Sequence, residues 1–389
     1  MNWKPHINKE KMVAWRRHLH KYPELAFQEK ETSAYIIKAL EAMPGIEIIC
    51  PPGTTSVIGV LKGAKPGKVV GVRADIDALA IQEEADVVFK SVNPGIMHAC
   101  GHDIHTATVL GVADVFSKIQ SELHGTVKFI FQAAEEQFPG GAKEIVESGM
   151  VSDCDYFMGA HVLANLKTGL ISCWPGPVTA FPDKFSITVT GKSGHGAAPE
   201  TAIDVVSVGA HIVTNLNSIV SRNISPHDSA VVSVTRFVAD SSLNILGATA
   251  TLGGTIRAKD AGVQSFIHKR MDEVVSGICK AYGANYELEI VGGYRPIYND
   301  EYLTSIVQET VKELYGAQTL VRPRVIMAGD DYSAFLQIAP QVFFLIGSGS
   351  AEEGYEYAVH NAKYIASEDI LPIGCEMFIA CTLKLLANQ

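Results

Sequence analysis

Cysteine is scarce and unpaired in this sequence. The chain has 389 residues and seven cysteines, an odd number, and no two of them form a Cys-x-x-Cys motif. This scatter excludes a disulfide-stapled scaffold and a zinc ribbon, and it is typical of proteins in a reducing compartment. We therefore expect a cytoplasmic protein.

Long apolar runs and long basic runs are also missing. No stretch of about 20 apolar residues is present, and the charges throughout Lys4 to Lys11 exclude an apolar signal core there. The formal net charge is -10, and the lysines and arginines form no long cluster. We therefore expect no membrane-spanning helix, and no membrane or nucleic acid as a partner.

The composition instead provides for a large packed protein. Hydrophobic residues make up 47% of the chain and charged residues 19%, which is enough apolar material for more than one core. A chain of this length is expected to form two or three domains.

Short apolar runs alternate with helical patterns in the first part of the chain. The runs at 69–73, 126–132 and 155–160 are typical of buried strands, and residues 62–68 are interpreted as a hairpin turn between two strands. Strands that alternate with helices predict an α/β domain with a mixed, largely parallel sheet flanked by helices.

The pattern changes between residues 181 and 291, where four strand patterns and two helical patterns follow one another. This segment predicts a self-contained α+β unit with a four-stranded sheet and two helices. The first pattern then resumes. We therefore expect one domain made of residues 1–180 and 292–389, interrupted by an inserted domain of residues 181–291.

Thiol and imidazole groups are concentrated in the stretch His98-Ala-Cys-Gly-His-Asp-Ile-His105. Thiolate and imidazole are ligands that borderline divalent metals prefer. Gly101 allows a tight turn, so that Cys100 and His102 can point at one spot. We also expect Asp103 to cap a helix, whose positive end would stabilise the thiolate.

Further acids and histidines stand where predicted strands end. Glu135, Glu136 and His161 do so, Asp77 closely follows the first run, and His360 lies in a loop before the last helix. Adjacent acids can also be the solvated first turn of a helix. However, ligands of parallel sheets bind at the carboxyl ends of the strands, which favours a site here.

The chemistry of these residues favours a pair of metal ions. The candidate ligands are Cys100, His102, Glu136, His161 and His360. One catalytic zinc takes about three protein ligands, so five suit two divalent ions that share a bridge, such as the sulfur. Glu135 would act as general base, and Asp77 would orient a ligand imidazole. This set of groups suits the hydrolysis of an amide.

A series of motifs covers almost the whole chain. They are Arg16-Arg-His-Leu-His20, Pro23-Glu-Leu25, Arg73-Ala-Asp-Ile-Asp-Ala-Leu79, Met97-His-Ala-Cys-Gly-His-Asp103, Phe131-Gln-Ala-Ala-Glu-Glu136, Gly194-His195, Gly254-Thr-Ile-Arg257 and His360-Asn361. In this order they resemble the M20 metallopeptidase family, and within it the amidohydrolase branch of hippurate hydrolases, N-acyl-amino-acid deacetylases and auxin-conjugate hydrolases.

The resemblance implies a catalytic domain that binds two metal ions and an inserted lid. It places the five candidate ligands, Glu135 and Asp77 at the family's corresponding positions. It adds His195, Asn244 and Arg257 as substrate-binding residues of the lid, where a guanidinium suits a carboxylate.

Family members often work with manganese, whereas the ligand types favour zinc, nickel or cobalt. Relatives commonly form homodimers or higher homo-oligomers through the lid.

We therefore expect a two-metal amidohydrolase that cleaves N-acyl amino acids, such as N-acetyl or N-benzoyl compounds, into a carboxylate and a free amino acid. Two alternatives stay open: a metallo-dipeptidase or aminopeptidase of the same family, and a non-catalytic amino-acid-binding relative. The segment Ala328-Gly-Asp-Asp-Tyr332 and the alanines at positions 80, 133 and 362 depart from the family pattern. These departures leave the ligands intact and bear on the choice of substrate.

Overall fold

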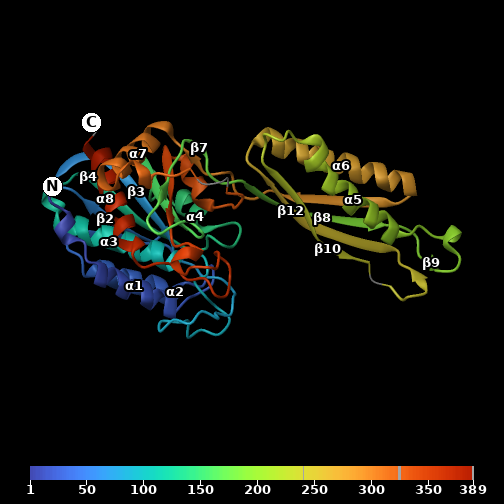
Figure 1. Cartoon of the computed structure of the whole chain (residues 1–389), viewed down its shortest axis with the longest axis horizontal. Coiled ribbons are helices and arrows are strands. Elements are labelled where there is room, and N and C mark those ends of the chain that lie inside the picture. Colours follow the sequence, from blue (N-terminus) through green and yellow to red (C-terminus); the bar gives the residue numbers. More distant parts are fainter. Residues whose placement is uncertain (240, 323–325, 388–389) are drawn as a thin grey trace. The chain divides into compact units, whose positions relative to one another are not determined.

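The computed structural model describes residues 1–239, 241–322 and 326–387, and it divides into two compact units (Figure 1). The first unit contains Met1–Val178, a segment that begins at Ile297, and the chain from Asp330 onward. The second unit contains Thr179–Pro296 and a short return segment that ends at Gly329. The chain therefore leaves the first unit after residue 178 and re-enters it at residue 297.

A seven-stranded mixed sheet forms the centre of the first unit, in the order β1-β2-β4-β3-β5-β15-β6. Its strands are β1 (Ile46–Ile49), β2 (Val57–Lys62), β3 (Lys65–Asp75), β4 (His124–Gln132), β5 (Tyr156–Leu163), β6 (Ile171–Ser172) and β15 (Gln341–Gly347). The four strands β4, β3, β5 and β15 pair in parallel, and the remaining pairs are antiparallel. The predicted α/β fold with a largely parallel sheet is confirmed. The carboxyl ends of the four parallel strands meet at one edge.

Helices pack around this sheet. They are α1 (Lys9–Lys21), α2 (Lys30–Glu41), α3 (His102–Lys118), α4 (Gly141–Glu147), α7 (Glu301–Tyr315) and α8 (Ile370–Ala387), with short 3-10 helices at Lys4–His6, Gln120–Glu122, Ala317–Thr319, Asp331–Gln337 and Ala351–Glu353. Helix α3 is buried along nearly its whole length. Its N-terminus therefore carries side chains into the interior rather than to the surface.

Three local expectations are wrong. Strands β2 and β3 do not form a hairpin, because β4 lies between them. Helix α3 begins at His102 after Gly101, whose φ of 90° makes the turn, so Asp103 lies inside the first turn and does not cap it. His161 lies within β5 and not after its end.

The second unit has its own antiparallel sheet, in the order β10-β12-β8-β13. Its strands are β8 (Phe181–Thr190), β10 (Ala230–Val238), β12 (Thr249–Ala258) and β13 (Asn285–Val291), beside the short strands β9 (Gly194–His195) and β11 (Ile245–Leu246). Helices α5 (Val205–Asn223) and α6 (Ala261–Tyr282) cover one face of this sheet (Figure 1). Asp204 and Asp260 cap the two helices. A separate hydrophobic core lies between the helices and the sheet.

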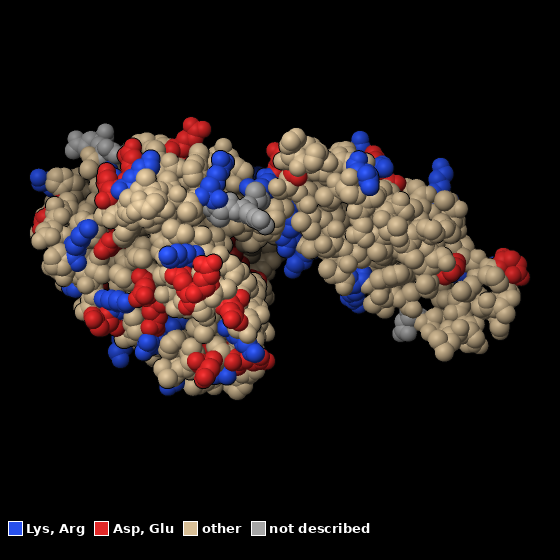
Figure 2. Space-filling model, in the orientation of Figure 1, with Lys and Arg blue, Asp and Glu red and all other residues tan. Residues whose placement is uncertain are grey.

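One helix, α8, has the length and composition of a membrane span, contrary to expectation. Of its apolar window, 61% is buried inside the protein, and Leu371, Phe378 and Leu385 belong to the core of the first unit. The core helix of a globular unit has the same composition. On the face shown in Figure 2, positive and negative side chains are interspersed over the first unit.

Two short antiparallel strands pair at the point where the chain leaves the first unit and returns to it. Strand β7 (Gly176–Pro177) pairs with β14 (Tyr298–Asn299). Asn299 is 1% exposed, and its side chain donates to the carbonyl of Phe343 at 2.8 Å and accepts from the amide of the same residue at 2.6 Å. Asn299 therefore fastens this ladder to β15.

We expect Asn299→Ala to lower the free energy of unfolding by about 2–4 kcal/mol, because it leaves the buried amide and carbonyl of Phe343 without partners. Urea unfolding followed by tryptophan fluorescence would measure this, since the three tryptophans all lie in the first unit. The exposed Asn2, which lies in the same unit as the tryptophans, is the control, and its replacement by alanine should change stability by less than about 0.5 kcal/mol. Equal stability of the two variants would contradict the prediction.

Candidate metal centre

The structure brings the five candidate ligands together at the carboxyl edge of the sheet. Nitrogen or sulfur atoms of Cys100, His102 and His161 all lie within 4.8 Å of one another, and so do ligand atoms of Cys100, Glu136 and His360. Cys100 belongs to both groups. Two groups of three ligands that share one sulfur match the arrangement expected for two ions with a bridging thiolate.

Buried atoms without hydrogen bonds among these residues are consistent with a metal site. The Nε2 of His102 and the Oε1 of Glu136 are buried and make no hydrogen bond to any part of the chain that the structure describes. The Sγ of Cys100 lies 3.4 Å from the Nε2 of His161, and the Nε2 of His360 lies 3.1 Å from the Oε1 of Glu136. Buried polar atoms are normally hydrogen-bonded, so atoms of this kind that lie close together without hydrogen bonds are suited to cations.

Asp77 links two of the candidate ligands. The Nδ1 of His102 lies 3.0 Å from the carbonyl oxygen of Asp77 and 3.1 Å from its Oδ1. This leaves the Nε2 of His102 for a metal ion. The other carboxylate oxygen of Asp77 accepts a hydrogen bond from the amide of Glu136 at 2.9 Å. Such contacts orient a ligand before an ion arrives.

The electrostatics of Cys100 differ from expectation. Burial raises the pKa of its thiol well above the ordinary value, and the charges of Glu136 and Glu135 raise it further. The positive end of α3 does not overcome these effects. The sulfur therefore carries a proton in the metal-free protein and must release it when an ion binds.

Two of the candidate ligand histidines have pKa values shifted in opposite directions. Burial lowers the pKa of His161 to about 3, with a further contribution from His105, so this imidazole is neutral and ready to bind an ion. Burial also opposes charge on His102, but Asp75 and Asp77 outweigh it and raise its pKa to about 10. An ion at this position therefore displaces a proton from His102.

Glu135 is buried next to the ligand groups. It is 8% exposed, and its carboxylate lies within 4.8 Å of ligand atoms of His102 and Glu136, and likewise of Asp330 and Asp331. Burial raises the pKa of Glu135 well above its usual range, and the charge of Asp330 adds to this. A carboxyl group in this position is able to hold a proton near neutral pH.

Sequence reasoning missed the ion-pair cluster beneath Glu135. The guanidinium of Arg73 contacts Asp75 at 2.7 Å, Asp330 at 3.3 Å and Asp331 at 3.2 Å, all in the interior. Asp331 also accepts a hydrogen bond from the side chain of Gln132. These residues stand in motifs and segments noted in the sequence. Only their distance along the chain concealed that they meet.

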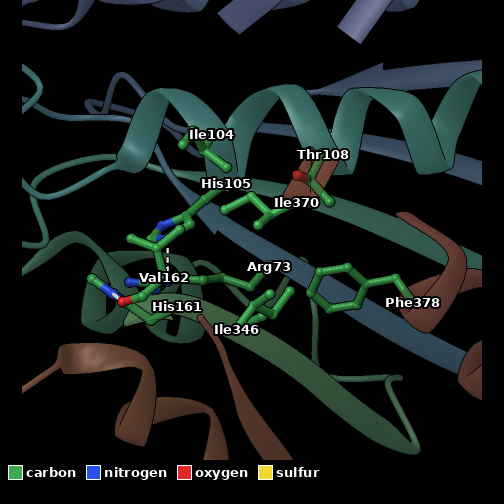
Figure 3. A pocket seen from close by; sticks show the side chains of 10 residues that line it. Arg73, Ile104, His105, Thr108, His161, Val162, Ile346, Ile370 and Phe378 are labelled. Carbon is green, nitrogen blue, oxygen red and sulfur yellow. Dashed lines mark hydrogen bonds between the residues drawn. The ribbon is translucent and has the colours of Figure 1, made fainter. Parts of the chain in front are cut away.

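His105 supports the ligand groups without joining them. Its Nδ1 donates to Asp75 at 2.6 Å, and its Nε2 accepts from the amide of Val162 at 3.0 Å, so both ring nitrogens are occupied. Figure 3 shows His105 and His161 beside a cavity of about 20 Å³, together with apolar side chains of α3, β15 and α8. This cavity has the size of one water molecule.

A second buried network supports the start of α3. The carboxylate of Asp103 accepts from Arg16 at 2.7 Å and lies 2.9 Å from the Nδ1 of His20, whose other nitrogen lies 3.1 Å from Glu83. Burial opposes the charge of Asp103, but the adjacent Arg16 outweighs it and holds the pKa of this carboxyl well below its usual range. Asp103 thus anchors the turn that carries Cys100.

The substrate-binding residues predicted for the insert lie in two places within it. His195 pairs with Ile245, next to Asn244, and both predicted residues are exposed. Strand β12 begins at Thr249, just after β11, which pairs with His195. Arg257 lies eight residues further along β12, which corresponds to about 27 Å along a strand. Its guanidinium donates to the hydroxyl of Thr255 and to the carbonyl of Ile256. The insert therefore does not bring the three residues into one cluster.

Known proteins share this architecture. The family model described as Peptidase family M20/M25/M40 matches residues 71–384. An N-acyl-L-amino acid amidohydrolase of Geobacillus stearothermophilus is 45% identical over 291 residues, which cover 75% of this chain and 78% of that protein. An N-acetylcysteine deacetylase of Bacillus subtilis is 36% identical over 369 residues, 95% of each chain.

A solved structure agrees with these matches. The YXEP protein of Bacillus subtilis is described as a dinuclear metal binding peptidase from the M20 family. It is 31% identical to this chain, with a TM-score of 0.85 over 98% of this chain and 99% of that one. The family resemblance of the motifs is thereby confirmed.

We expect stability to fall in acid because of Asp103. Its pKa is lower in the folded protein than in the unfolded chain, so its stabilising effect is complete above pH about 4 and is lost as the pH falls further. Asp103→Asn should cost about 3–5 kcal/mol at pH 7, because it breaks a buried ion pair, and should flatten the acid side of the stability curve.

Thermal unfolding of metal-free protein between pH 2 and pH 7 would test this prediction. The exposed Glu122, replaced by glutamine, is the control and should leave the curve unchanged. An unaltered acid slope in the Asp103 variant would refute the assignment.

We also expect the two ligand groups to lose metal differently. Cys100→Ser should weaken the binding of both ions because Cys100 belongs to both groups, whereas His161→Ala should remove one ion per chain. Metal analysis after dialysis measures the stoichiometry, with the exposed His227 replaced by alanine as control. Retention of both ions by the Cys100 variant would contradict the shared-sulfur arrangement.

Proposed function

Because this chain belongs to the peptidase family M20/M25/M40, we propose that it is a metal-dependent amidohydrolase that cleaves N-acyl amino acids into a carboxylate and a free amino acid. One observation carries the proposal: two ligand groups share Cys100, and the buried acid Glu135 lies beside them. This set of groups suits the hydrolysis of an amide by a metal-activated water.

In this proposal each side chain has a separate task. The ligands Cys100, His102, Glu136, His161 and His360 hold two divalent ions. These ions, when bound, supply Lewis acidity to the scissile carbonyl and to the attacking water. Manganese, zinc, nickel and cobalt are the candidates, because the set mixes soft and hard ligands.

Glu135 moves the proton. Its carboxylate takes a proton from the attacking water and delivers it to the nitrogen that leaves as the free amino group. The burial and neighbouring charges that raise its pKa make it a strong enough base to accept this proton. Asp77 keeps the imidazole of His102 in the orientation that leaves Nε2 toward the ions.

The insert would recognise the amino-acid end of the substrate. Among the described residues, the guanidinium of Arg257 donates to neutral oxygens, although the charge of Asp183 also acts on it, so we propose that it can bind a substrate carboxylate. His195 and Asn244 are proposed as further substrate contacts. Assembly of copies through the insert, and a cytoplasmic location in keeping with seven free cysteines, complete the proposal.

We expect Glu135→Gln to lower kcat by about 10²–10⁴-fold while the protein keeps its metal ions, because the amide cannot accept the proton. The assay uses N-acetyl and N-benzoyl amino acids beside dipeptides, and metal content is measured in parallel. Glu144→Gln, on the neighbouring helix α4, is the matched control. Full turnover by the Glu135 variant would end the proposal, and activity on dipeptides alone would favour a dipeptidase.

A further inference from the structure

The loop that carries Glu135 and Glu136 has an unusual backbone. Ala134 has a φ of 54° and is buried, although left-handed backbone is unfavourable for residues with a side chain. His360 has a φ of 65°. Two of the residues around the ligand groups thus adopt a conformation that the surrounding structure must enforce.

Three side chains from distant parts of the chain hold the amides of this loop. The hydroxyl of Ser56 accepts from the amide of Ala133 at 3.0 Å, and Asp77 accepts from that of Glu136. Between them, the Oε1 of Glu29 accepts from the amide of Ala134 at 2.8 Å. Glu29 therefore acts on the residue with the left-handed backbone.

Glu29 is itself an unusual residue. It is 0% exposed, and among the described residues it forms no ion pair with a cation. Its second carboxylate oxygen accepts from the hydroxyl of Thr55 at 2.6 Å. Burial raises the pKa of Glu29, which reflects the cost of placing a carboxylate there. The hydrogen bonds from Thr55 and Ala134 offset part of this cost.

The side chain of Glu29 does not cap the helix that it precedes. Glu29 stands at the N-cap position of α2, yet its side chain caps nothing there. Glu24 instead accepts from the amides of Glu31 and Thr32, at 3.2 Å and 2.8 Å. Glu29 is thus free to reach the Ala134 loop, 105 residues further along the chain.

We propose that Glu29 is a positioning residue for the reaction. Its carboxylate holds the amide of Ala134, which keeps this residue left-handed and thereby aims Glu135 at the ligand groups and Glu136 into them. This role rests on the proposed function of Glu135 as general base. Among the described residues, the side chain of Glu29 bonds to the amide of Ala134 and the hydroxyl of Thr55 and to no candidate ligand, so it acts through the backbone of the loop.

Variants of Glu29 separate positioning from general stability. At saturating metal, Glu29→Ala should lower kcat by about 10–100-fold with little change in KM, because the base is misaimed. Glu29→Gln keeps an acceptor for Ala134 and should stay within about threefold of the parent. Glu24→Ala, which removes a helix cap, should lower the melting temperature without changing kcat.

A double variant tests the backbone itself. Glycine adopts the left-handed conformation without steric cost, so adding Ala134→Gly to Glu29→Ala should recover about threefold or more of the lost kcat. Hydrogen exchange gives a readout without metal or turnover. The amide of Ala134 should exchange about tenfold faster in Glu29→Ala than in Glu24→Ala.

If Glu29→Ala does not fold, Glu29→Met fills the same volume without an acceptor and should give the same results. Three results would each overturn the positioning role. They are full kcat in Glu29→Ala or Glu29→Met, unchanged hydrogen exchange at the amide of Ala134, and no recovery of kcat when Ala134→Gly is added. These outcomes are distinct from failure of the proposed function, which Glu135→Gln tests alone. An inactive Glu135 variant beside a fully active Glu29 variant would reject only the positioning role.

Discussion

A surplus of buried negative charge at the carboxyl edge of the seven-stranded sheet is the constraint on which the structure depends. Asp75, Asp330 and Asp331 share one guanidinium, that of Arg73, and no ion pair with Glu135 occurs among the residues described. In a poorly solvated region such charges raise one another's pKa or attract cations. Burial raises the pKa values of the Cys100 thiol and the Glu135 carboxyl, and the surplus of negative charge raises them further. Divalent ions at the ligand groups would balance it.

The fold meets this constraint by holding its donors in place before any ion binds. Asp77 fixes both the ring of His102 and the amide of Glu136, and Asp103 ties the start of α3 to α1 through Arg16. Each anchor comes from a different element, so the centre depends on the whole first unit being folded. Ligands that are oriented in advance lose little conformational entropy on binding, which favours affinity.

The convergence of the candidate ligands could be predicted from the sequence, because residue chemistry and the ends of most predicted strands point to them without knowledge of packing. The predictions that are wrong depend on distant contacts. The hairpin between β2 and β3 does not form because β4, which follows about 60 residues later, occupies the place between them. Asp103 has the chemistry of a cap, but its partner Arg16 lies 87 residues away. Local helix geometry predicts an acidic thiol at Cys100, and burial among carboxylates reverses this.

The position of β15 has a consequence for biosynthesis. This strand lies between β5 and β6, yet the whole insert separates it from them in the sequence. As the polypeptide leaves the ribosome, β5 remains an unpaired edge, and the imidazole of His360 has not yet been made. The insert has its own core and can fold during this interval. The ligand group that contains His360 is therefore completed only in a nearly finished chain, and a chain that ends before β15 would leave the edge of β5 unpaired and prone to aggregation.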